Sequence, residues 1–172
     1  MHLLDGGVSM SGNVTTAKNS ISKFALAKSI ISSFTLQRML ASKTVECGLL
    51  CATGDDSLEE CVELRRPSTA TLQLMQQLEQ SGSESSNITE GMSEAIETLM
   101  VTNQGKKFNR VMVMFTDGET PLGSKTDVGA VRKGLVDNGI LLYVIILCDQ
   151  SRDDLVSSVS ENIEQYQELA KR

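Results

Sequence analysis

The sequence predicts an α/β fold in which a doubly wound, mostly parallel sheet is flanked by helices. Segments typical of strands alternate with segments typical of helices along the chain. The run 140–147 is apolar without alternation, as expected for a strand buried on both faces of a parallel sheet. With 172 residues, 40% of them hydrophobic, and only two prolines, the chain has the composition of a globular protein. We therefore expect a single domain over residues 1–172.

The first half of the chain predicts three strands and two helices. A short apolar run ends at Asp5-Gly6-Gly7, which is typical of a strand followed by a tight turn. Phe24, Ala27 and Ile31 then recur at helical spacing, and Lys23 lies among the polar positions of that helix. The expected strands are 1–4, 45–52 and 60–65, the last at a sheet edge, and the expected helices are 18–40 and 67–78.

The second half predicts two strands and three helices. Asn87 followed by Glu90 is an N-cap signal, and Ile88, Met92 and Leu99 then fall on one helical face. The remaining elements are a strand at 111–115 ending in Thr116-Asp117-Gly118, a helix through Val128, Val131 and Leu135, the strand 140–147, and a helix through Leu155, Val159, Ile163 and Tyr166.

The charge balance disfavours a broad nucleic-acid surface on this segment. Lys and Arg number 16 against 22 Asp and Glu, so the formal net charge is −6. That is the wrong sign for gripping phosphates over a large area. The longest apolar run is about half of the roughly 20 residues that a membrane-spanning helix requires, so we expect no membrane insertion.

Few catalytic mechanisms fit the residue types present. His2 is the only histidine and lies at the start of the chain, where we expect fraying. Serine and cysteine nucleophiles activated by imidazole are therefore disfavoured. The glycine-rich phosphate-binding motifs of dinucleotide-binding and P-loop proteins are absent. A small-molecule hydrolase on such a sheet would lack a base, so we expect no enzyme.

Two carboxylates are expected at one end of the sheet. Asp5 ends the first strand and Asp117 ends the fourth, and the carboxyl ends of parallel strands meet at the same edge. The hydroxyls of Ser9 and Ser86 are expected nearby. Hard oxygen donors of this kind suit Mg²⁺ or Mn²⁺. The alternative is that the two acids only cap helix N-termini and turns.

Three segments of the chain resemble a known family. They are Asp5–Ser11 (DGGVSMS), Ser86–Ile88 and Phe115–Gly118. In this order they resemble the three loops that build the metal-ion-dependent adhesion site of von Willebrand factor type A domains. The resemblance implies a Rossmann-like sheet.

Compared position by position, Asp5, Ser9, Ser86 and Asp117 match four positions of that adhesion site. Gly7 stands where the family usually has the first serine, so a fifth position is vacated. Because a hydroxyl ligand is missing, the resemblance implies a degenerate site. We expect no tightly bound metal and no cofactor, with weak Mg²⁺ binding at most.

More narrowly, the chain resembles the N-terminal domain of the larger subunit of Ku, the heterodimer that binds DNA ends. The resemblance lies in Gly7, the helix FALAKSIISSFTLQRML, and the stretches GLLCATGDD and GKKFNRVMVMFTD. Gly118 and Glu119 depart from it and resemble an ordinary type A domain. The resemblance implies that the chain is a fragment of a longer protein, and that the usual domain has a further strand and helix after Arg172.

The Ku resemblance implies a nuclear protein-interaction domain without catalysis, acting in non-homologous end joining and telomere maintenance. The implied partners are a smaller Ku subunit and repair and telomere factors that carry short basic-hydrophobic docking peptides. Double-stranded DNA ends would be held by other parts of the full-length protein. The alternative is a generic type A domain that binds a protein ligand through a Mg²⁺-dependent adhesion site.

Ile96 and Met100 lie beside the apolar stripe of the helix that starts near Asn87. They either line an apolar groove for such docking peptides or simply widen the contact of the helix with the core.

Overall fold

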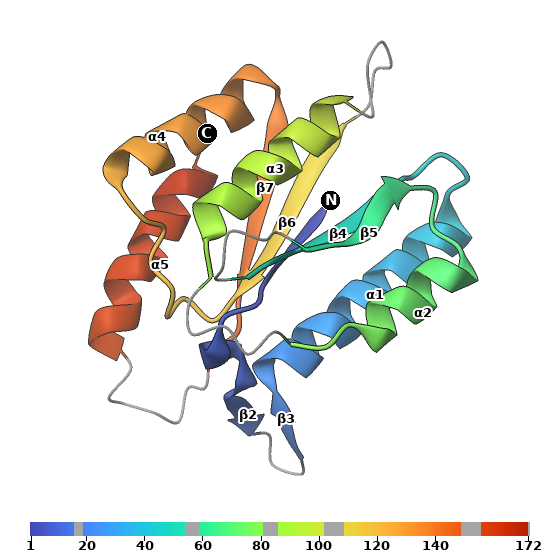
Figure 1. The fold of residues 1–172 in the computed structure, drawn as a ribbon, viewed down its shortest axis with the longest axis horizontal. Helices are drawn as coiled ribbons and strands as arrows, with labels where there is room; N and C mark the ends of the chain where they lie inside the picture. The colour runs from blue at the N-terminus through green and yellow to red at the C-terminus, as the bar shows by residue number, and fades with distance from the viewer. Residues whose placement is uncertain (16–18, 54–58, 81–85, 102–108, 149–155, 172) are drawn as a thin grey trace.

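A five-stranded sheet forms the middle layer of the protein, in the order β5-β4-β1-β6-β7 (Figure 1). The computed structural model describes residues 1–15, 19–53, 59–80, 86–101, 109–148 and 156–171. The strands of this sheet are β1 (His2–Asp5), β4 (Cys47–Ala52), β5 (Glu59–Arg65), β6 (Arg110–Thr116) and β7 (Ile140–Ile146). All neighbours pair in parallel except β5, which runs antiparallel to β4 at one edge. The predicted doubly wound, mostly parallel sheet is confirmed.

Helices cover both faces of the sheet. They are α1 (Lys23–Ala41), α2 (Thr69–Gln77), α3 (Ile88–Val101), α4 (Lys125–Asp137) and α5 (Val156–Ala170). In Figure 1, α1 and α2 lie on one face, and α3, α4 and α5 lie on the other. Among the described residues, no helix combines the length and the apolar character needed to cross a membrane.

Two buried leucines of β1 separate the hydrophobic cores on the two faces. Successive side chains of a strand point to opposite faces, so Leu3 packs in the core under α3, α4 and α5, and Leu4 in the core under α1 and α2. Burial of each side chain contributes roughly 1.5–3 kcal/mol. A slip of β1 by one residue would exchange the two faces, so these leucines fix the register that places the end of β1.

The first helix begins later than the sequence pattern predicts. Residues 13–15 (β2) and 20–22 (β3) form a small antiparallel hairpin, and α1 starts at Lys23 instead of residue 18. The Ser22 hydroxyl accepts a hydrogen bond from the Ala25 amide at 3.1 Å, which caps the helix N-terminus. Similarly, Ser68 caps α2, so Pro67 lies before the helix rather than in its first turn.

The prediction that β7 is buried on both faces is wrong for the described part of the chain. β7 lies at the edge of the sheet, and Tyr143 at its centre is 56% exposed. A local apolar run cannot distinguish a central strand from an edge strand, because position in the sheet depends on which other strands pair with it.

His2 is not frayed. It lies in β1 between two neighbouring strands, is 4% exposed, and its ring packs edge-on against Phe34 at a centroid distance of 5.6 Å. Burial, and secondarily the nearby N-terminal ammonium, lowers the pKa of His2 from 6.5 to about 3. His2 is therefore neutral in the folded protein at neutral pH.

This burial makes the stability of the fold depend on pH. Unfolded chains take up the His2 proton below pH 6.5, whereas the folded chain resists it down to about pH 3. The His2 contribution is therefore intact above pH 6.5 and is lost as the pH falls toward 3. When the pH falls from about 7.5 to about 4.5, the free energy of unfolding measured with urea should decrease by roughly 2–3 kcal/mol more in the wild type than in His2→Leu. Equal losses in the two proteins would contradict this assignment.

Candidate functional site

The carboxyl ends of β1 and β6 bring the two predicted acids to one edge of the sheet. Leu4 of β1 pairs with Phe115 of β6, so Asp5 lies level with Thr116 and Asp117 follows one residue further along. Ser86 reaches the same edge because it precedes Asn87, whose side chain caps α3 through the Glu90 amide at 3.2 Å. The predicted convergence of the acids and Ser86 is thus present.

Asp5 is the buried centre of a hydrogen-bond network. Its Oδ1 accepts from the Gly7 amide at 2.9 Å and from the Ser86 hydroxyl at 2.6 Å. Its Oδ2 accepts from the Thr116 hydroxyl at 2.7 Å. Burial raises the pKa of Asp5 above its ordinary value, and the nearby charge of Asp117 raises it further. The three hydrogen bonds lower the pKa but do not cancel the rise. Asp5 thereby ties the loop after β1 to the start of α3 and the end of β6.

Asp117 is held by a lysine from the first turn of α1. The Lys23 ammonium donates to Asp117 Oδ2 at 2.8 Å and to Glu119 Oε1 at 2.9 Å. The side chains of Lys23 and Asp117 are 7% and 0% exposed, so this is a buried ion pair. The other oxygen, Asp117 Oδ1, accepts from the Glu119 amide at 3.0 Å. Desolvation lowers the pKa of Lys23, but both carboxylates outweigh it and raise the pKa overall.

Helix α5 fixes the loop that carries Asp117. Asn162 donates to the Gly118 carbonyl at 2.9 Å, and the fully buried Tyr166 donates its hydroxyl to the Thr120 carbonyl at 2.8 Å. Gly118 has a φ of 78°, a left-handed conformation that glycine adopts without strain. The loop is therefore held in one conformation by bonds from two helices, α1 and α5.

Gly7 lies at the centre of these loops. A Cβ added at Gly7 would lie 3.1 Å from Asp5 Oδ1, 3.4 Å from Ser86 Oγ and 3.5 Å from Thr120 Oγ1. Ser9 follows in a short 3₁₀ helix over Val8–Ser11 and is half-buried. Within the described residues, the Ser9 hydroxyl is bonded to neither acid.

Comparison with known proteins identifies the family. The sequence profile of the von Willebrand factor type A domain matches residues 2–168. The chain belongs to the von Willebrand factor type A domain family. Domains of this family mediate protein–protein interactions. No curated protein matches the chain.

Solved structures share the fold of this type A domain. The SpRpn10 VWA domain has a TM-score of 0.71 and 17% identity over 99% of this chain and 80% of its own. BatB, a conserved hypothetical protein from Bacteroides thetaiotaomicron, has a TM-score of 0.65 and 15% identity over 99% of this chain and 98% of its own. An aerotolerance-related membrane protein from Bacteroides fragilis NCTC 9343 has a TM-score of 0.63 and 16% identity over 96% and 86%.

The residues present do not fit the divalent ion that the family implies. Each oxygen of Asp5 and Asp117 already accepts a hydrogen bond from the protein itself. Gly7 offers no hydroxyl, and the Lys23 ammonium already binds Asp117. Among the described residues, no cluster of three or more His, Cys, Asp or Glu side chains offers an alternative set of ligands.

The sequence did not identify two side-chain partners of the acids, Lys23 and Thr116. Helical periodicity placed Lys23 on a polar face, and Thr116 was only part of a strand end. Only Lys23 carries a signal: a lysine in a helix's first turn faces the positive end of the helix dipole, which is unfavourable without a specific partner.

The predicted peptide groove gains no support at Ile96. Ile96 is 8% exposed and belongs to the core between α3 and α4, where a Cβ on Gly134 would lie only 3.1 Å from its Cδ1. Met100 is half-buried beside it. Ile96 therefore widens the core contact, as the alternative interpretation has it.

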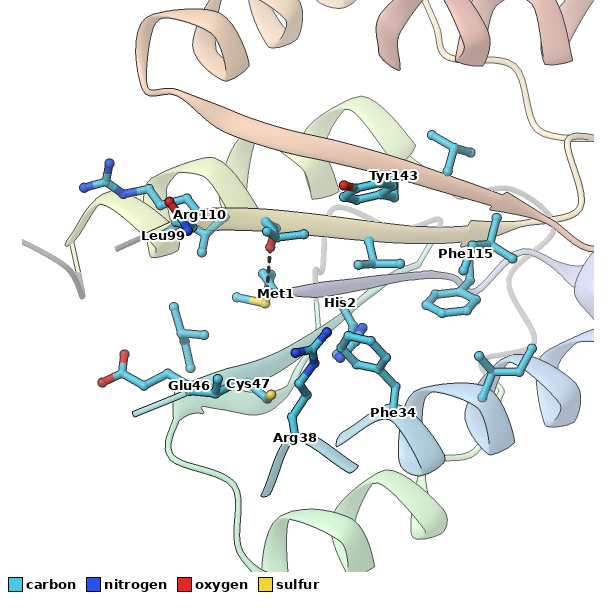
Figure 2. A pocket seen from close by; sticks show the side chains of 18 of the residues that line it. Met1, His2, Phe34, Arg38, Glu46, Cys47, Leu99, Arg110, Phe115 and Tyr143 are labelled. Atoms are coloured by element: carbon cyan, nitrogen blue, oxygen red, sulfur yellow. Dashed lines mark hydrogen bonds between the residues drawn. The ribbon is translucent and has the colours of Figure 1, made fainter. Parts of the chain in front are cut away.

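A separate cavity of about 750 Å³ is lined by residues of β1, β4, β6 and β7 together with α1 (Figure 2). His2, Phe34, Arg38 and Tyr143 are among its lining residues. The His2 Nδ1 atom is buried there without a hydrogen-bond partner in the described structure. Neither Asp5 nor Asp117 lines this cavity, so it is separate from the site of the two acids.

The Asp5 network predicts a specific effect of Ser86→Ala. Losing the hydroxyl leaves Asp5 Oδ1 with one donor fewer, which should cost roughly 1–3 kcal/mol of unfolding free energy. The pKa of Asp5 should rise further, because the Ser86 bond lowers it. Urea denaturation and NMR titration of the Asp5 carboxyl measure both effects. Ser11→Ala is the matched control, since its exposed hydroxyl bonds only the Val8 carbonyl. Identical results for the two variants would refute the network.

Proposed function

We propose that this chain is a metal-independent protein-interaction domain. The observation that carries the proposal is the buried pair between Lys23 and Asp117, which occupies a carboxylate that a bridging metal would need. The runner-up function, in which a protein ligand is bound through Mg²⁺, requires that carboxylate to be open. The arrangement therefore favours direct contacts between side chains of this domain and its partner over contacts bridged by a metal ion.

The charge around the loops suits a basic partner. The Lys23 ammonium pairs with two carboxylates, Asp117 and Glu119, and the Glu119 side chain remains 34% exposed. The whole chain carries a net charge of −6. Complementary charge accelerates association and suppresses wrong partners, so basic peptide segments are the partners that this domain fits best.

The larger protein, in this proposal, is a Ku-like DNA-end-binding subunit. The support is the order and extent of the similar segments: the helix FALAKSIISSFTLQRML, the stretch GLLCATGDD and the stretch GKKFNRVMVMFTD. The domain would act without catalysis in the nucleus, recruiting repair and telomere factors, while DNA is held by basic parts of the protein outside these residues. A smaller Ku subunit would complete the heterodimer.

The Ku-like placement predicts binding to DNA ends by the full-length protein. Copurified with the smaller subunit, it should shift a linear duplex in a gel assay and leave a closed circular duplex of the same sequence unshifted. The 172-residue chain alone should shift neither, because of its acidic charge. Failure to copurify, or equal binding to linear and circular DNA, would contradict the Ku-like assignment. Neither result would contradict the proposal that the chain is a protein-interaction domain.

The metal-independent role predicts how partner binding responds to solution conditions. Binding of a basic peptide, measured by fluorescence anisotropy, should change less than about twofold when EDTA is added, because no divalent ion bridges the contact. Raising the salt from about 0.05 M to about 0.5 M should weaken it, because screening shortens the range of the charges. An acidic peptide of matched length is the control. If the domain instead binds the acidic peptide more tightly, and EDTA abolishes that binding, the Mg²⁺-dependent alternative is favoured.

A further inference from the structure

Lys23 occupies a position that is electrostatically unfavourable on its own. It is the first residue of α1, where unpaired amides create a partial positive charge, and no acidic residue lies in that first turn. Its side chain is 7% exposed, so the ammonium has also lost most of its hydration. A lysine is stable there only because other groups supply compensating negative charge.

Two carboxylates from the loop after β6 supply that charge. Asp117 and Glu119 lie 94 and 96 residues further along the chain and bind the ammonium at 2.8 and 2.9 Å. These are charge-assisted bonds of ordinary length. The backbone also holds Lys23 in place, because its amide donates to the Gly12 carbonyl at 2.8 Å. Lys23 thus joins the segment that ends at Gly12, through its backbone amide, to the loop after β6, through its ammonium.

A divalent ion would have to compete directly with this ammonium. To bind Asp117 Oδ2 it must break the bond from Lys23, and it would then lie close to a buried positive charge. Two unit charges 4 Å apart interact by about 4 kcal/mol at an effective dielectric constant of 20, and a divalent ion doubles that repulsion. The displaced ammonium would also lose its compensating carboxylate.

We propose that the Lys23 ammonium is the resident cation of this site and that it excludes divalent metal ions from it. The ammonium neutralises Asp117 and orders the loops permanently, so the site needs no exchangeable ion. The family's metal site is therefore latent in this chain and is uncovered by removing one positive charge. This inference does not depend on the Ku-like placement.

Gly7 offers a competing explanation, which the experiment must separate. If the missing hydroxyl alone prevented metal binding, Gly7→Ser would restore it. Gly7 has φ −59° and ψ 154°, a conformation that serine adopts without strain. The new side chain would lie among Asp5, Ser86 and Thr120, where a Cβ has 3.1–3.5 Å of separation from its neighbours.

The test is a Mn²⁺ titration of four proteins. Binding is measured by calorimetry and by the paramagnetic broadening of the Gly7, Gly118 and Glu119 amide signals in NMR spectra. The proteins are the wild type, Gly7→Ser, Lys23→Met and Lys28→Met. Lys28 is the matched control, because it lies in the same helix and its ammonium donates to the backbone carbonyls of Gln76 and Leu78 and lies over the Phe24 ring, with no carboxylate bound to it among the described residues. Lys23→Met/Asp117→Asn then tests whether any new binding uses Asp117.

Lys23→Met should bind Mn²⁺ at least about a hundredfold more tightly than the wild type, and the double variant should lose that gain. The wild type, Gly7→Ser and Lys28→Met should show no selective broadening at millimolar Mn²⁺. Selective broadening in the wild type, or a gain in Gly7→Ser equal to that in Lys23→Met, would overturn the proposal. The proposal would also be overturned if Lys23→Met folds but binds Mn²⁺ no more tightly than the wild type.

Folding is checked separately by thermal melting in circular dichroism. If Lys23→Met does not fold, Lys23→Gln replaces it, because its amide can still donate to one of the two carboxylates while removing the charge. The wild-type measurement requires no variant and overturns the proposal by itself if the site takes up Mn²⁺.

Discussion

A lysine ammonium buried between two carboxylates determines how the loop end of this protein is built. Breaking a buried ion pair by removing one partner costs roughly 3–5 kcal/mol, because the remaining charge is left uncompensated. The Lys23–Asp117 pair therefore constrains three segments together: the hairpin that leads into α1, the helix itself, and the loop after β6. The neighbouring Asp5 network adds the loop after β1 and the start of α3.

These constraints separate the fold of the family from the chemistry of its site. The sheet order and helix layers are those of a type A domain, and the two acids lie at the carboxyl ends of the adjacent strands β1 and β6. Their oxygens, however, are engaged by the chain's own amides, hydroxyls and ammonium. The loops are consequently ordered without an ion, and their charge remains predominantly negative, which is the basis for proposing a basic partner.

The sequence predicted the parts of this arrangement that depend on local patterns. Alternating strand and helix periodicity gave the sheet and its layers, strand ends located Asp5 and Asp117, and the cap at Asn87 located Ser86. Lys23 was missed because periodicity concerns the helix face of the Cα atom, whereas its long side chain carries the ammonium to a loop about 94 residues away. His2 and β7 were misplaced since burial depends on neighbouring strands, which local periodicity does not specify.

A crystal structure of the wild-type chain grown with millimolar Mn²⁺ tests the central claim most directly. The account predicts no anomalous difference peak between the loops, with the Lys23 ammonium still in hydrogen-bond contact with Asp117 and Glu119. An anomalous peak within coordination distance of Asp117, with the ammonium displaced toward solvent, would contradict it.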